Sequence, residues 1–77
     1  MERIINHLAE IRADCQITQK ELADATSSSL RTIIYIESGH APNLLLALRI
    51  ADYFSLPLER IFTYEKGDIT SDNRPRT

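Results

Sequence analysis

Few side chains in this 77-residue chain are suited to catalysis or metal binding. Cys15 is the single cysteine, and with only His7 and His40 beside it the chain has no metal-ligand spacing. A thiol nucleophile also needs a positioned base and an orienting group, which the sequence does not suggest. We interpret Cys15 as a structural residue at a helix end. With no glycine loop for phosphate, no paired carboxylates and no Ser/His/Asp set, we expect neither an enzyme nor a cofactor nor a metal site.

The composition is that of one small globular domain. Hydrophobic residues make up 43% of the chain and charged residues 26%, which is far from the composition of disordered chains. No apolar run approaches the roughly 20 residues of a membrane-spanning helix, so we expect a cytoplasmic protein with no membrane contact. The formal net charge of −2 argues mildly against nucleic acid, because basic side chains supply most non-specific affinity. Net charge does not exclude a local basic site.

Hydrophobic periodicity and capping residues predict five short helices. Apolar residues three or four positions apart predict a first helix over residues 2–15. Thr18 and Glu21 have capping-box spacing and open a second helix that ends near Ala25. Hydroxyl residues then suit a turn that ends in an N-cap, followed by a third helix over residues 30–38.

The end of the chain carries weaker signals. Gly39 can end the third helix in the left-handed conformation, and Asn43 can cap a fourth helix. Pro57 is tolerated in a first turn and predicts a short fifth helix through residue 61. The β-forming residues 62–65 then predict a short edge strand.

Taken together, these residues resemble the Cro/repressor-type helix-turn-helix family, and in particular its small members similar to the cytolysin repressor. The matching positions are residues 17–23, Ser29, residues 32–33, 36–37, Gly39, Pro42, residues 47–51 and 58–62. The resemblance implies an all-α, five-helix, lambda-repressor-like DNA-binding domain over residues 1–65. The helix-turn-helix would span residues 18–38, and residues 66–77 would form a flexible tail.

The resemblance also implies that the third helix enters the major groove of operator DNA. Its base-contacting candidates are Leu30, Arg31, Ile34 and Tyr35. The planar fork of Arg31 can bond guanine O6 and N7, with a phosphate contact as the alternative. Leu30 and Ile34 can pack against a thymine methyl. Tyr35 can bond a base or a phosphate through its hydroxyl, or be a plain exposed aromatic residue.

Phosphate-contacting candidates lie at helix starts and in the loop before the fourth helix. They are Gln19, Ser29, Thr32, His40 and Asn43. Each of these residues also has a simpler explanation. Gln19 and His40 would then be solvated side chains, and Ser29 and Asn43 would be plain N-caps. The family positions of Arg12 and Glu37 imply a partly buried ion pair that orients the third helix.

Four positions and one loop depart from the family pattern. Ser27 stands where the turn commonly has glycine and Ser28 where it commonly has an apolar residue, so we expect a strained or less tightly packed turn. The loop between Gly39 and the fourth helix is one residue shorter than the common form. Leu30 and Ile34 replace the polar residues more usual on the DNA-reading face. Together these departures bear on DNA binding and leave the expected fold unchanged.

An apolar surplus predicts dimerisation. Leu44, Leu46, Leu56, Phe62 and Tyr64 exceed what a five-helix core obviously needs, and exposed apolar surface usually marks an interface. By resemblance, the strand after the last helix pairs across a two-fold axis. Such a homodimer would hold its reading helices about 34 Å apart, one turn of a palindromic operator.

These expectations describe a sequence-specific transcriptional regulator of the repressor type that binds double-stranded DNA. Two other classes stay open. Leu30, Ile34 and the acidic balance are compatible with a protein-interaction module that has lost DNA reading. An antitoxin, or the controller of a restriction-modification system, would keep DNA binding and add a second protein partner.

Overall fold

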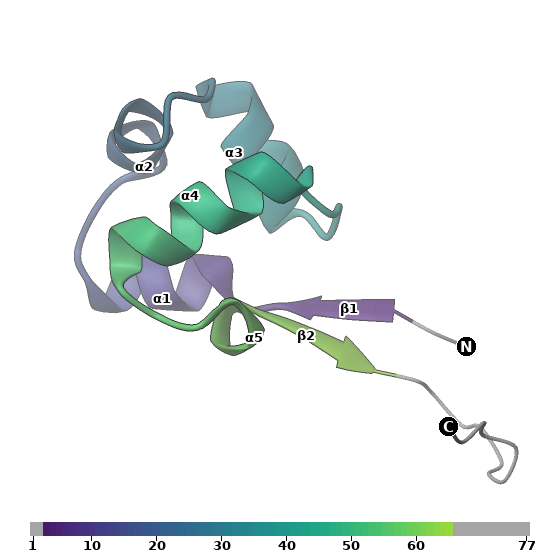
Figure 1. The fold of residues 1–77 in the computed structure, drawn as a ribbon. Helices are drawn as coiled ribbons and strands as arrows, with labels where there is room; N and C mark the ends of the chain where they lie inside the picture. The colour runs from purple at the N-terminus through teal and green to yellow at the C-terminus, as the bar shows by residue number, and fades with distance from the viewer. Residues whose placement is uncertain (1–2, 66–77) are drawn as a thin grey trace, which may run out of the picture.

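The computed structural model describes residues 3–65, which form five helices and a two-stranded sheet (Figure 1). The helices are α1 (Leu8–Asp14), α2 (Gln19–Ala25), α3 (Leu30–Glu37), α4 (Leu44–Phe54) and α5 (Leu58–Ile61), and the strands are β1 (Arg3–Asn6) and β2 (Phe62–Glu65). In Figure 1, α2 and α3 lie at one end of the molecule, α1 and α5 at the other, and α4 between them. None of these helices is long and apolar enough to cross a membrane. The predicted tail at 66–77 lies outside the described residues.

Local capping chemistry begins three of the helices where the sequence predicts. The hydroxyl of Thr18 accepts the backbone N–H of Glu21 at 3.0 Å, and the Glu21 carboxylate accepts the Thr18 N–H at 2.7 Å, which completes a capping box. Ser29 and Asn43 each accept the N–H three residues later, at 3.0 and 2.8 Å. Each cap contributes about 1 kcal/mol to helix stability. The starts of α2, α3 and α4 are therefore determined locally.

The predicted first helix over residues 2–15 is wrong at its N-terminal end. Residues 3–6 form strand β1, which pairs antiparallel with β2 so that Ile4 lies opposite Tyr64 and Asn6 opposite Phe62. Isoleucines have high β propensity, and two of them in sequence fit a strand as well as a helix face. Pairing with β2 decides between the two, because it satisfies the strand's backbone groups. The strand expected at 62–65 is confirmed, and its partner here is β1 of the same chain.

The core lies where α1, α2, α3, α4 and α5 meet. Its fully buried large apolar side chains are Leu8, Leu22, Ile33, Ile36, Ile50 and Ile61. Ala23 is buried on α2, where a larger side chain would separate the helices. Thr26 is the one buried polar residue described, and its hydroxyl donates to the Leu22 carbonyl at 2.8 Å. That bond removes the cost of burying the hydroxyl.

The apolar surplus expected at a dimer interface divides into three groups by burial. Leu46 was expected there but is only 7% exposed and belongs to the core, because α4 turns this side chain inward. Leu56 and Phe62 are half-buried and pack against the core. Leu44 and Tyr64 remain 68% and 58% exposed. The surplus was overestimated, since a single chain covers three of the five residues wholly or in part.

The turn between α2 and α3 places Ser27 in the left-handed region, with φ of 57°. The backbone N–H of Ser28 donates to the Ala23 carbonyl at 2.9 Å, which closes the end of α2. A residue with a Cβ pays a steric cost in this conformation, whereas glycine does not. Ser27 is exposed, and no hydrogen bond from its hydroxyl is described.

We expect Ser27→Gly to raise the free energy of unfolding by about 0.5–1 kcal/mol, because relief of the positive φ exceeds the added entropy of the unfolded chain. Urea denaturation followed by circular dichroism measures the change. Ser27→Ala is the matched control, since alanine keeps the Cβ and should give no gain. Equal stability of the two variants would show that Ser27 is unstrained.

Candidate nucleic-acid interface

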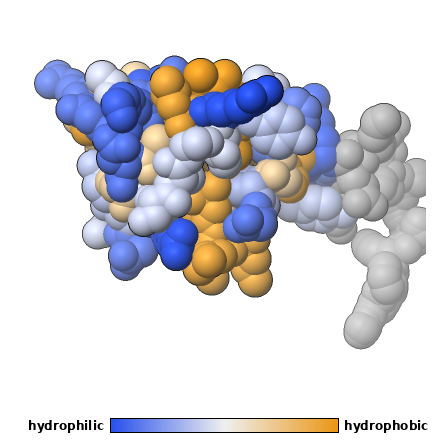
Figure 2. Space-filling model, turned by 90° about the horizontal axis from the view of Figure 1, so that it is seen from above, coloured by the Kyte–Doolittle hydropathy of each residue, from blue (hydrophilic) through white to orange (hydrophobic). Residues whose placement is uncertain are grey.

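The outer face of α3 is the candidate interface. α2 and α3 bury Leu22 against Ile33 and Ile36, so the opposite side of α3 faces outward. Its exposed residues are Leu30, Arg31, Ile34 and Tyr35, which recur at the spacing of one helical stripe. Figure 2 looks onto the end of the molecule that carries α2 and α3, and shows orange apolar surface between hydrophilic side chains. The structure thus places all four base-contacting candidates on one accessible face.

Ser29 and Thr32 lie together at the start of this helix. The two hydroxyl oxygens are 2.8 Å apart, and the Ser29 oxygen also accepts the Thr32 N–H. Both candidates therefore lie beside the backbone N–H groups of the first turn, which have no partners within an α-helix. Such N–H groups and hydroxyls are suited to a DNA phosphate.

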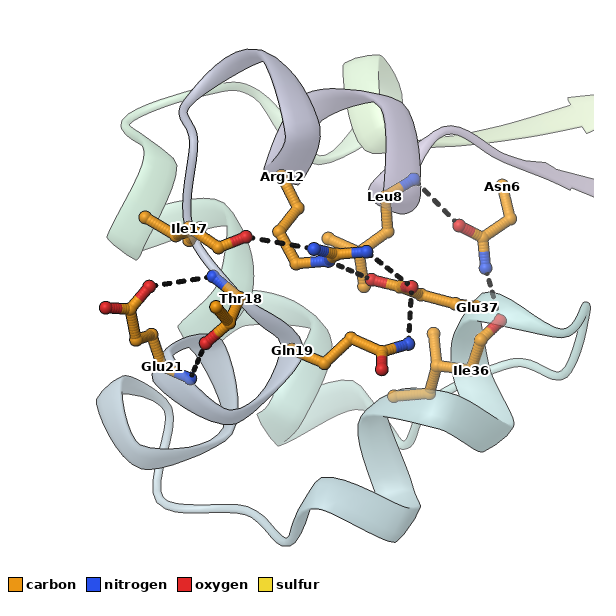
Figure 3. A network of polar contacts seen from close by, with 9 residues as sticks. All are labelled: Asn6, Leu8, Arg12, Ile17, Thr18, Gln19, Glu21, Ile36 and Glu37. Atoms are coloured by element: carbon orange, nitrogen blue, oxygen red, sulfur yellow. Dashed lines mark hydrogen bonds and ion pairs between the residues drawn. The ribbon is translucent and has the colours of Figure 1, made fainter.

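A network of polar contacts connects α3 to α1 and α2 (Figure 3). Arg12 donates from Nε to Glu37 Oε2 at 2.8 Å and from a terminal nitrogen to Glu37 Oε1 at 3.2 Å. The other terminal nitrogen of Arg12 donates to the Ile17 carbonyl at 2.9 Å, just before α2. The Glu37 side chain is only 8% exposed and that of Arg12 19%. The structure thus brings together the two residues whose family positions implied an ion pair.

This ion pair is a forked, charge-assisted contact in a largely buried site. The hydrogen bonds to Glu37, together with the attraction of its charge, raise the pKa of Arg12 above its ordinary value, while burial acts in the opposite direction. Arg12 therefore stays protonated at any physiological pH. The contact holds the last turn of α3 against α1.

Gln19 lies in the same network. Its side-chain N–H donates to Glu37 Oε1 at 3.0 Å, and the side chain is half-buried. We expected the Gln19 amide to be free to contact a phosphate. In the structure its N–H is instead directed inward to a carboxylate (Figure 3). The spacing of Gln19 and Glu37 along the chain gives no sign of this bond. The backbone N–H groups of the first turn of α2 stay the better phosphate donors.

Asn6 was not singled out from the sequence. Its side-chain N–H donates to the Ile36 carbonyl at 2.6 Å, and its side-chain oxygen accepts the N–H of Leu8 at 2.8 Å. One side chain therefore closes an Asx-turn at the start of α1 and contacts the end of α3. An asparagine two residues before a helix is an Asx-turn signal, but the overlong helix expected over residues 2–15 hid it.

His40 and Asn43 follow α3. The imidazole of His40 stacks on the ring of Tyr35, with ring centroids 4.0 Å apart and planes at 10°. Asn43 caps α4 through Leu46, so its side-chain oxygen is already occupied. Both residues are exposed, and they lie in the segment that leads from α3 to α4.

Acidic residues are distributed away from this face. Between Ala25 and Ala51, Glu37 is the only acidic residue, and its charge is paired with Arg12. Glu21 and Asp24 on α2 mark the limit of this stretch on one side and Asp52 on the other. The face formed by α3 and the start of α4 is therefore free of unpaired carboxylates, and a net charge of −2 does not oppose DNA there.

Comparison with known proteins agrees with this geometry. The model of a helix-turn-helix family matches residues 8–61. The chain belongs to the Cro/C1-type helix-turn-helix family. The match covers the whole span from α1 to α5, so the resemblance drawn from the sequence is confirmed at the level of the family.

Members of this family with similar sequences occur in archaea and bacteria. An uncharacterized HTH-type transcriptional regulator of Methanocaldococcus jannaschii is 44% identical over 64 residues, which cover 82% of this chain and 97% of the relative. One from Archaeoglobus fulgidus is 35% identical over 63 residues, with 80% and 89% covered. The regulator YgzD of Bacillus subtilis is 36% identical over 62 residues, with 79% and 94% covered.

We expect Glu37→Ala to lower the free energy of unfolding by about 3 kcal/mol, because it leaves the Arg12 charge without its counter-ion and removes the acceptor of the Gln19 amide in a largely buried site. Glu37→Gln keeps an acceptor oxygen and should lose less. Urea denaturation measures both.

Asp24→Ala is the matched control for this prediction. It removes the carboxylate of the exposed Lys20–Asp24 pair, 3.4 Å apart, and should cost less than about 0.5 kcal/mol. A loss at Glu37 no larger than the loss at Asp24 would mean that the network does not hold α3 in place.

Proposed function

We propose that this protein is a transcriptional repressor that binds a palindromic operator as a homodimer, with α3 in the major groove. The observation that carries the proposal is an outward stripe on α3 that includes Arg31, free of unpaired carboxylates, on a helix fixed by the Arg12–Glu37 ion pair. Family membership and relatives named as transcriptional regulators support the same function. We propose no catalytic role.

Individual roles follow from the positions on α3. Arg31 reads a guanine through O6 and N7, and Tyr35 contacts a base through its hydroxyl. Leu30 and Ile34 are exposed near the same edge and pack against thymine methyl groups. The hydroxyls of Ser29 and Thr32 and the N-terminal N–H groups of α3 hold a phosphate. His40 and Asn43 lie beside the flanking backbone of the operator.

The proposed dimer surface lies beside the sheet. A shallow apolar hollow is lined by Ile4, Ala41, Pro42, Leu44, Ala47, Leu58 and Phe62. Ile4 is paired directly opposite Tyr64, so both side chains project from the same face of the sheet. Leu44, Tyr64 and this hollow give a second copy protruding and recessed apolar parts, which a two-fold contact requires. Pairing of β2 across the axis is a further part of the proposal.

We expect Arg31→Ala to weaken operator binding about 10- to 100-fold, because one bidentate contact to guanine is worth about 1–3 kcal/mol. Fluorescence anisotropy measures binding to duplex DNA from upstream of the protein's own coding sequence. The wild-type affinity should fall with salt, in proportion to the number of phosphates neutralised.

Arg60→Ala is the control for Arg31. Arg60 lies on α5, at the opposite end of the molecule from α3 (Figure 1), and its removal should change the affinity less than about twofold, within the effect of one distant charge. Equal losses at the two arginines would indicate a non-specific charge effect. Absence of saturable wild-type binding at low salt would overturn the proposed function.

The dimer surface is tested by exchanging two exposed tyrosines for serine. Tyr64→Ser should raise the dimer dissociation constant at least about tenfold, because it removes an aromatic contact near the proposed axis. Tyr53→Ser removes a similarly exposed ring from the end of α4 and should leave dimerisation unchanged. Sedimentation equilibrium measures both constants, and equal values would place the interface elsewhere.

A protein-interaction module is the second candidate, because Leu30 and Ile34 expose apolar surface where polar side chains would read bases. The DNA affinity of two serine variants distinguishes a DNA-reading helix from a protein-interaction module. If Leu30→Ser and Ile34→Ser leave DNA affinity intact, the two side chains make no thymine contact, and a protein partner becomes the better account of them.

A further inference from the structure

The end of α3 forms a Schellman motif that brings two aromatic rings together. Gly39, with φ of 116°, donates its N–H to the Ile36 carbonyl at 3.0 Å, and the His40 N–H donates to the Tyr35 carbonyl at 3.4 Å. These two backbone hydrogen bonds define the motif, and they place the residue after Gly39 over the last turn of the helix. His40 thereby reaches Tyr35, five residues earlier.

The contact between the two side chains is specific. The rings lie 4.0 Å apart and nearly parallel, and His40 Nδ1 is 3.1 Å from the Tyr35 carbonyl oxygen. A carbonyl only accepts, so Nδ1 carries the proton in that bond. Ser38 adds a second contact at the same point, since its hydroxyl donates to the Tyr35 carbonyl at 2.8 Å and lies 3.3 Å from Nδ1. The imidazole is thus held by stacking and by a hydrogen bond.

The position of this stack matters because Tyr35 is the last residue of the outward stripe on α3. Its side chain is 54% exposed, and an exposed tyrosine on a helix otherwise has more than one rotamer open to it. The stacked imidazole covers one face of the phenol and so favours the ring orientation of the structure. The hydroxyl is then held in place before any ligand binds, which lowers the entropy lost on binding.

We propose that His40 is a positioning residue for DNA recognition, which orients the Tyr35 hydroxyl toward a base edge and so contributes to sequence specificity. This inference rests on the proposed function, since it takes α3 as the reading helix. It differs from the expectation that His40 contacts phosphate directly, because the imidazole acts here through Tyr35. Its ligand is duplex DNA, and its effect falls on the preference for the operator over other sequences.

Four variants test the proposal by anisotropy on the upstream duplex and on a scrambled duplex of equal length. Tyr35→Phe keeps the stack and removes the hydroxyl, and should weaken operator binding about fivefold, the worth of one hydrogen bond. His40→Ala removes the stack and should weaken it about three- to fivefold. The double variant should be no weaker than Tyr35→Phe by more than about twofold, because no hydroxyl is left to position.

His40→Phe is the fourth variant and the rescue. It keeps an aromatic ring over Tyr35 without ring nitrogens and should bind within about twofold of wild type. Tyr35→Phe and His40→Ala should leave binding to the scrambled duplex nearly unchanged, so that the ratio of the two affinities falls. Thermal melts should agree within a few degrees, since the backbone bonds of the Schellman motif do not depend on either ring.

Several outcomes would overturn the inference. His40→Ala with wild-type affinity, or losses that multiply in the double variant, would show that the two residues act independently. His40→Phe as weak as His40→Ala would show that operator binding depends on a ring nitrogen and not on the stacked ring. Equal losses on both duplexes would exclude base reading. If wild type binds the operator and Arg31→Ala weakens that binding, but the His40 and Tyr35 variants do not behave as expected, only the inference about His40 is wrong. If wild type binds neither duplex, the proposed function is wrong as well.

Discussion

The Glu37 carboxylate is the contact on which the arrangement of the helices depends. It lies at the end of α3 and accepts hydrogen bonds from Arg12 on α1 and Gln19 on α2. Arg12 extends the same network to the Ile17 carbonyl before α2. In a domain this small the apolar core alone supplies little stability. A directional contact among three helices fixes how α3 is presented, which non-directional burial does not do.

A buried ion pair of this kind is weak evidence for stability, because desolvation offsets much of the attraction between the charges. The consequence of the ion pair in this protein is that it fixes the orientation of α3 relative to α1. Removing either partner alone would leave the other charge buried without compensation. Asn6 acts alongside it, since its amide contacts the Ile36 carbonyl and so ties the start of α1 to the same end of α3. The polar groups at this end of α3 are therefore bonded to other elements, and its outer stripe is left exposed.

Charge distribution explains how an acidic chain can present a surface for DNA. The one carboxylate within α3 is turned inward and neutralised by Arg12, and the remaining acidic residues lie on α1, α2, the end of α4, α5 and β2 among the described residues. What matters for a phosphate backbone is the potential near α3, because distant charges are screened within about 10 Å at moderate salt. Net charge is therefore a poor guide to the partner of this domain.

By itself, the sequence determined the helix starts at Thr18, Ser29 and Asn43 and the strand at 62–65, because capping and β propensity act between near neighbours. The family pattern added the Arg12–Glu37 pair and the outward stripe of α3. Only the tertiary structure decided that residues 3–6 pair with β2, that Leu46 is buried and that Gln19 bonds Glu37. Those outcomes depend on contacts between residues distant in the chain, and helical or strand periodicity carries no information about such contacts.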